Sequence, residues 1–233
     1  MISKCLPVLV ALAIPSASIA STVTIDTVSG SQSYISQHGI RDNTATLGRD
    51  LVGMVVTASY LDGATEEVTW GEVRGGGEAS GTGFNLFYGW RAFELSVTRT
   101  LVSLSLNALT GNAIFDILPS RRDPGNTYGT KIGYPFHVVG DDDPDGAIDV
   151  SYSSRVIVAG QPHGTDAYTH MSIDFSGLEG GGLSSDLEFS TDLDSLAVAG
   201  DLTPVPLPAS LLLFGSALGV MGAGSLRKRK RTV

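Results

Sequence analysis

The chain has 233 residues, with 24 Asp and Glu, 15 Lys and Arg, and a single cysteine, Cys5. Residues 21–203 hold nine of the basic residues and all of the acidic ones, a net charge of −15, which argues against a nucleic-acid partner. A lone cysteine excludes disulfide scaffolds and cysteine-based zinc sites.

Residues 1–20 have the pattern of a secretory signal peptide. Lys4 precedes an apolar run over residues 6–14, and Ser18-Ile19-Ala20 places small residues where signal peptidase reads them. We expect cleavage after Ala20, so that the only cysteine leaves with the signal. The remaining chain is then exported.

Residues 21–203 are predicted to form one exported all-β domain. Apolar and polar residues alternate over 52–60, 101–106, 148–152 and 171–175. Shorter candidate strands are 22–28, 65–74, 82–88, 92–98, 113–118, 132–139, 155–160 and 186–190, separated by turns such as Asp62-Gly63, Gly75-Gly76-Gly77 and Gly180-Gly181-Gly182. The economical architecture is an antiparallel, jelly-roll-like β-sandwich.

Aromatic residues suggest one surface for sugars. Tyr60, Trp70, Tyr88 and Trp90 could form a platform on a sandwich face, with Tyr88 and Trp90 as the glycan contacts. The alternative is that these rings are buried, and the alternation of Trp70 with Val68 favours an inward position for that ring.

An Asp-rich segment suggests a structural calcium site. Carboxylates at positions 1, 3, 5 and 9 of a loop, with glycine at position 6, suit a hard cation, and the ligands would be Asp141, Asp143, Asp145, the carbonyl of Ala147, and Asp149. Tyr152 stands where an EF-hand has its glutamate, and the flanks read as strands. The segment is therefore similar to the β-hairpin calcium loops of integrin-type propellers; the alternative is a solvated acidic turn.

Motifs for catalysis are weak. His163 and His170 bracket Asp166, but there is no HExxH-like spacing and no Gly-x-Ser-x-Gly elbow. We therefore predict that the protein is not an enzyme.

The C-terminal segment, 204–233, has the pattern of a membrane anchor. Residues 207–226 carry no charge, and as a helix they would span about 30 Å, the thickness of a bilayer's hydrocarbon core. Basic residues at 227–231 predict a cytoplasmic stop. Thr203 to Pro206 is the expected linker between domain and anchor.

A Pro-rich motif, an apolar span and a basic end in this order resemble the VPLPA-CTERM variant of the PEP-CTERM sorting signals; the motif is Val205, Pro206, Leu207, Pro208, Ala209 and Ser210. The resemblance implies processing by an exosortase, a membrane protease of Gram-negative bacteria. It also implies anchoring in the inner membrane with the domain in the periplasm, followed by transfer to the cell surface or extracellular matrix. The expected role is structural or interactive; the alternatives are a carbohydrate-binding module of an exopolysaccharide matrix and a secreted hydrolase.

Overall fold

The computed structural model describes residues 22–25, 32–41, 46–89, 91–117, 133–140, 147–159 and 167–205. The predicted signal peptide and all of the predicted anchor from Pro206 onward lie outside the described residues. Among the described residues no helix has the length and apolar character needed to cross a membrane.

The described chain is built from short strands and one 3-10 helix, in agreement with the predicted all-β class. The elements are β1 (Thr22–Ile25), β2 (Tyr34–Ser36), η1 (Gly48–Leu51), β3 (Val55–Tyr60), β4 (Thr65–Thr69), β5 (Gly71–Val73), β6 (Gly76–Ser80), β7 (Phe84–Tyr88), β8 (Phe93–Val97), β9 (Leu101–Asn107), β10 (Ala113–Asp116), β11 (His137–Val138), β12 (Asp149–Val158), β13 (Ala167–Asp174), β14 (Leu187–Ser190), β15 (Leu193–Ser195) and β16 (Leu202–Pro204).

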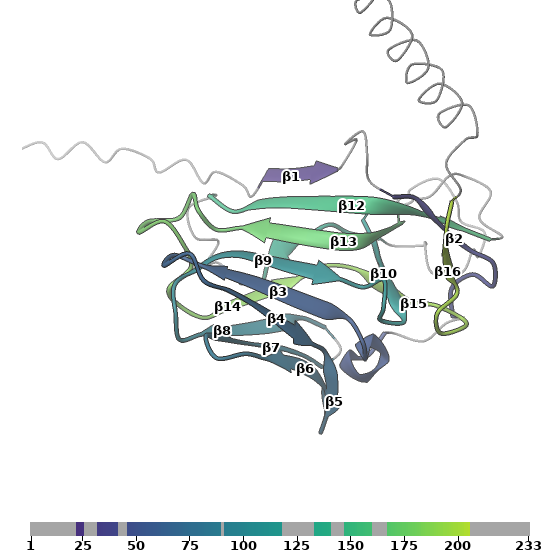
Figure 1. The fold of residues 1–233 in the computed structure, drawn as a ribbon, viewed down its shortest axis with the longest axis horizontal. Coiled ribbons are helices and arrows are strands. Elements are labelled where there is room, and N and C mark those ends of the chain that lie inside the picture. Colours follow the sequence, from purple (N-terminus) through teal and green to yellow (C-terminus); the bar gives the residue numbers. More distant parts are fainter. Residues whose placement is uncertain are drawn as a thin grey trace, which may run out of the picture.

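These strands form two sheets in a sandwich-like arrangement (Figure 1). The ten-stranded sheet has the order β16-β2-β12-β13-β9-β3-β4, with β1 beside β12 and with β10 joining β13 to β15. The six-stranded sheet has the order β11-β14-β8-β7-β6-β5. Buried side chains from both sheets, such as Leu104 of β9 and Phe93 of β8, belong to one main hydrophobic core.

Two details of the predicted architecture differ from the structure. The ten-stranded sheet is mixed, because β1 and β2 both run parallel to β12. The successive strands β5 to β8 are neighbours within one sheet, as in a meander, whereas the successive strands of a jelly roll largely alternate between sheets.

The predicted strand over 65–74 is divided at Trp70, where the chain passes from the ten-stranded to the six-stranded sheet. Trp70 is 1% exposed, and its indole N–H donates to the carbonyl of Gly48 at 2.8 Å. The backbone N–H of Gly48 donates in turn to the carbonyl of Gly89 at 3.0 Å. This contact fixes η1 against the end of the six-stranded sheet.

The glycines predicted to form a turn at 75–77 play two different roles. Gly75 has φ +90° and lies in the turn, whereas Gly76 and Gly77 begin β6. A Cβ on Gly77 would overlap the Trp70 indole nitrogen and the Gly48 carbonyl. Close approach of η1 and Trp70 to β6 therefore requires glycine at this position of the strand.

The prediction of a linker at 203–206 is also wrong for its first two residues, Thr203 and Pro204. Residues Leu202–Pro204 form β16, which pairs antiparallel with β2, and the N–H of Val205 donates to the carbonyl of Ser33 at 2.8 Å. A second, smaller core that includes Tyr34, Val156 and Leu196 supports this end of the sheet. The domain therefore continues into the first residue of the predicted sorting motif.

Candidate functional site

The predicted calcium loop is described only at its C-terminal end. Asp141, Asp143 and Asp145 lie outside the described residues, while Ala147 and Asp149 lie before and at the start of β12. The flanking elements are strands, as predicted, but β11 belongs to the six-stranded sheet and β12 to the ten-stranded sheet. The segment therefore crosses from one sheet to the other and does not close a hairpin.

A second carboxylate accompanies Asp149. Asp174, at the end of β13, is its direct cross-strand partner, and both residues are exposed. The Asp174 carboxylate accepts a hydrogen bond from the N–H of Ser176 at 2.8 Å. Like charges directly opposite each other destabilise a strand pair, so a cation near this end of β12 and β13 would relieve a repulsion.

The backbone carbonyl of Ala147, the predicted seventh-position ligand, faces Gly177. A Cβ on Gly177 would lie 2.6 Å from that oxygen, so glycine is what permits the approach. The turn after β13 therefore packs against the end of the Asp-rich segment, next to the pair of carboxylates.

Three of the four aromatic residues predicted to form a sugar platform are in the core. Tyr60, Trp70 and Tyr88 are 3%, 1% and 6% exposed. Tyr88 stacks on Phe93 with ring centroids 4.5 Å apart, and its burial raises the pKa of its hydroxyl. The alternative of buried rings, which the alternation of Trp70 with Val68 favoured, therefore holds for these three residues and excludes them from an exposed platform; Tyr60 and Tyr88 are buried because even-numbered residues of β3 and β7 point inward. Trp90, the remaining member, lies outside the described residues.

The histidine cluster is likewise only partly described. His163 and Asp166 lie outside the described residues. His170 of β13 is half-buried; its Nδ1 is 2.7 Å from the Thr169 hydroxyl, and burial lowers the pKa of its ring. These features favour a neutral imidazole within the sheet.

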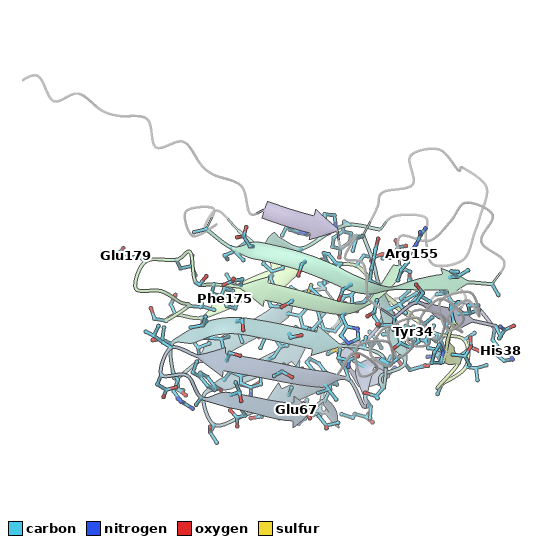
Figure 2. The ribbon with its side chains drawn as sticks, turned by 45° about the horizontal axis from the view of Figure 1, so that its top comes forward. Tyr34, His38, Glu67, Arg155, Phe175 and Glu179 are labelled. Carbon is cyan, nitrogen blue, oxygen red and sulfur yellow. The ribbon has the colours of Figure 1, made fainter. Side chains whose placement is uncertain are left out.

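A carboxylate that the sequence did not single out fixes the C-terminal end of the domain. The buried side chain of Asp201 accepts hydrogen bonds from the Ser36 hydroxyl at 2.5 Å and the His38 backbone N–H at 3.0 Å, and lies 2.7 Å from His38 Nδ1. Burial alone raises the pKa of this carboxyl, but the hydrogen bonds outweigh it and lower the pKa to about 2. Figure 2 shows His38 at the end of the molecule opposite Glu179.

Another unpredicted group of acids lies at the junction of β10, β13 and β15. Asp116, Asp192 and Asp194 have carboxylate oxygens within 4.8 Å of one another, and Asp116 is fully buried. Such oxygens could hold a hard cation. Each of the three also has an interaction within the protein, so none of them is a free carboxylate.

The acidic cluster is separate from Asp149, the one carboxylate of the predicted calcium loop among the described residues. Asp116 pairs with Ala167 and Asp149 pairs with Asp174, which are the two ends of β13. Seven residues of a strand span about 23 Å. A cation bound at Asp149 therefore does not use ligands from the acidic cluster.

No family model, curated protein or solved structure matches this chain.

Proposed function

We propose that this chain is an exported β-sandwich protein that an exosortase-type protease sorts to the surface or extracellular matrix of a Gram-negative bacterium. Its signal peptide is residues 1–20, its exported domain runs from residue 21 through β16 to Val205, and its sorting signal begins with the motif at Val205 and ends at residue 233. Its role is structural or interactive, without catalysis.

The observation that carries the proposal is the order of features at the C-terminus. The domain's last strand, β16, is followed without a gap by the motif that begins at Val205, then by an uncharged segment at 207–226 and a basic end at 227–231. The signal-like N-terminus and the net charge of −15 of residues 21–203 agree with an extracytoplasmic domain.

The test is to determine both termini of the protein recovered from cells. An epitope inserted after Gly63, an exposed residue in the turn between β3 and β4, should be tolerated. The tagged chain would be produced in a Gram-negative host with and without an exosortase, and its ends identified by mass spectrometry. We expect an N-terminus at Ser21 in both hosts and loss of the basic C-terminus only where the protease is present.

Matched proline variants separate the motif from the strand before it. Pro206→Ala together with Pro208→Ala should leave the C-terminal segment uncut. Pro204→Ala changes β16 outside the motif, so the C-terminal segment of this variant should still be cut. The intact chain, with residues 1–20 and 227–233 both present, recovered from the cytosol of the exosortase-bearing host, would contradict the proposal.

A structural calcium ion in the Asp-rich segment is a second proposal. The ligands are Asp141, Asp143, Asp145, Ala147 and Asp149. The described observation that favours it is the Asp149–Asp174 cross-strand pair, because a divalent ion there would neutralise two opposed carboxylates.

A further inference from the structure

A hollow of about 290 Å³ lies beside η1 at the end of the six-stranded sheet. Its lining includes Arg49 of η1 and residues of β5, the following turn and the start of β6, together with one residue after β7; those used below are Glu72, Arg74, Gly75, Gly76 and Gly89. We call this hollow the arginine groove. Its volume is at the small end of ligand pockets, which run from about 300 to 1,000 Å³, so it suits one or two rings.

The walls of the arginine groove are fixed by packing. Gly48 bonds to both Trp70 and Gly89, as described above, and a Cβ on Gly76 would overlap the carbonyl of Tyr88. Backbone is therefore packed against backbone behind the groove. The two arginines extend from elements that cannot shift independently of each other.

The two arginines of this groove have no binding partner among the described residues. Neither the Arg49 nor the Arg74 side chain forms an ion pair or hydrogen bond there, and both residues are exposed. The neighbouring acid, Asp50, is already engaged: it accepts from the N–H of Leu47 at 2.9 Å and lies 3.4 Å from Arg41. Two guanidinium groups that have no partner among the described residues therefore lie at one hollow of a domain whose acids outnumber its bases.

A second hollow contains an arginine that, unlike those of the arginine groove, is already paired. It is lined by Tyr60, Leu61, Asp62, Arg99 and Thr100. Arg99 lies 4.0 Å above the Tyr60 ring and forms a 2.5 Å ion pair with Asp62, so its charge is neutralised and its position is fixed. Arg99 is therefore a matched control for an arginine that is not available to a ligand.

We propose that the arginine groove binds a sugar carboxylate, such as a uronic acid residue of an acidic polysaccharide. This proposal rests on the proposed function, which places the domain in an extracellular matrix. A guanidinium presents a planar fork of N–H donors that matches a carboxylate. Glu72 also lines the groove, so the two arginines leave one net positive charge there, which matches a single carboxylate better than a doubly charged phosphate.

The test is calorimetric titration of the full-length protein in detergent with three probes: trigalacturonate, neutral maltotriose and inorganic phosphate. Salt at about 0.15 M keeps the Debye length near 8 Å, so the negative charge of the whole domain does not mask a local contact. We expect trigalacturonate to bind more tightly than either other probe. Arg49→Gln and Arg74→Gln should each weaken this binding about tenfold, and Arg99→Gln should leave it unchanged.

Three results would overturn the proposal: no heat with trigalacturonate, equal affinity for maltotriose, or unchanged affinity in both groove variants. Tighter binding of phosphate would overturn the choice of a sugar acid. Thermal melting of each variant checks that it is folded; we expect unchanged melting temperatures, because both arginines are exposed and have no ion pair or hydrogen bond among the described residues. Affinity is measured on purified protein, so a failure here is distinct from a failure of the export experiment, which measures termini.

Discussion

At the scale of single residues, the glycines around η1 show how a side chain that is missing can determine a fold. Gly77 lies where the Trp70 indole and the Gly48 carbonyl meet β6, and a methyl group there would overlap both. Gly89, also near this contact, is different: the atom nearest to a Cβ at this position would be 3.7 Å away, and its φ is not positive.

We expect Gly77→Ala to destabilise the protein by at least about 2 kcal/mol, because it overpacks the contact and displaces the buried Trp70–Gly48 hydrogen bond. Gly89→Ala should change the free energy of unfolding by no more than about 0.5 kcal/mol. Urea unfolding of the two variants measures both values. Equal stability of the two would show that η1 moves aside easily and that the contact does not fix it.

At the scale of elements, β16 is held to the sheet by a small polar network as well as by strand pairing. Asp201 precedes the strand and binds Ser36 and His38, which belong to β2 and the turn after it. After the strand, Gln32 Nε2 donates to the carbonyl of Val205 at 3.1 Å. Both ends of β16 are thereby tied to β2 and the residues beside it. A strand of three residues would be weak without these contacts.

The Asp201 network gives β16 a defined pH dependence. The carboxyl pKa is about 2 in the folded protein and 3.8 in its ordinary state, so ionised Asp201 stabilises the fold fully above about pH 4, and this contribution is lost as the pH falls toward 2. The difference in free energy of unfolding between wild type and Asp201→Asn should therefore be largest at pH 5–7 and shrink at pH 2. Denaturant titrations across this range measure it.

A variant of Ser36, a hydrogen-bond partner of Asp201, tests whether the lowered pKa of Asp201 causes this pH dependence. Ser36→Ala removes one hydrogen bond to the Asp201 carboxylate and so raises its folded-state pKa toward 3.8; the pH-dependent loss of stability should therefore be smaller than in wild type and should be complete at a higher pH. A constant difference between wild type and Asp201→Asn from pH 7 to pH 2 would show that the charge of Asp201 does not hold the strand.

Local patterns predicted those elements whose burial alternates along the chain. The run over 101–106 became β9, because Leu104 and Leu106 face the core while Ser103 and Ser105 do not. The same reasoning failed for β6, because its glycines look like turn residues until Trp70 and η1 are in place. Strands as short as β2 and β16 carry too few residues to show a period.

The candidate sites were predicted less well, for a related reason. Asp116 and Asp192 are far apart in the sequence, and only the pairing of β10 with β13 and β15 brings their carboxylates together. Arg49 and Arg74 meet at one groove because the chain crosses between sheets at Trp70. Spacing in the sequence indicates candidate ligands within one loop, as predicted for the Asp-rich segment, but not those assembled from several strands.

At the scale of the whole molecule, the two sheets are joined by contacts near the Asp-rich segment. The buried Tyr152 of β12 accepts a hydrogen bond from the N–H of Phe136 at 2.8 Å, and its hydroxyl lies 2.9 Å from that of Thr191. Phe136 immediately precedes β11, and Thr191 immediately follows β14, so both partners are adjacent to strands of the six-stranded sheet. Residues 139–148 then connect β11 to β12, so a cation bound there would strengthen a junction that a buried hydrogen bond already makes.

We expect calcium to stabilise this junction. Five carboxylates within nine residues, with Asp174 facing the last of them, repel one another until a divalent ion neutralises them. Calcium at about 100 times its dissociation constant should raise the melting temperature of the full-length protein by about 5–10 °C relative to EDTA. Differential scanning calorimetry in the two buffers measures the shift, and identical melting curves would rule out the site.

Two variants decide where such an ion binds. Asp149→Asn should abolish the calcium-dependent shift, because it removes the ninth-position ligand, while Asp194→Asn should preserve it, because that carboxylate lies at the other end of β13. The opposite result, a shift lost in Asp194→Asn and kept in Asp149→Asn, would move the ion to the Asp116–Asp192–Asp194 cluster. The ion would then support the β10–β13–β15 junction within the ten-stranded sheet and not the connection between the sheets.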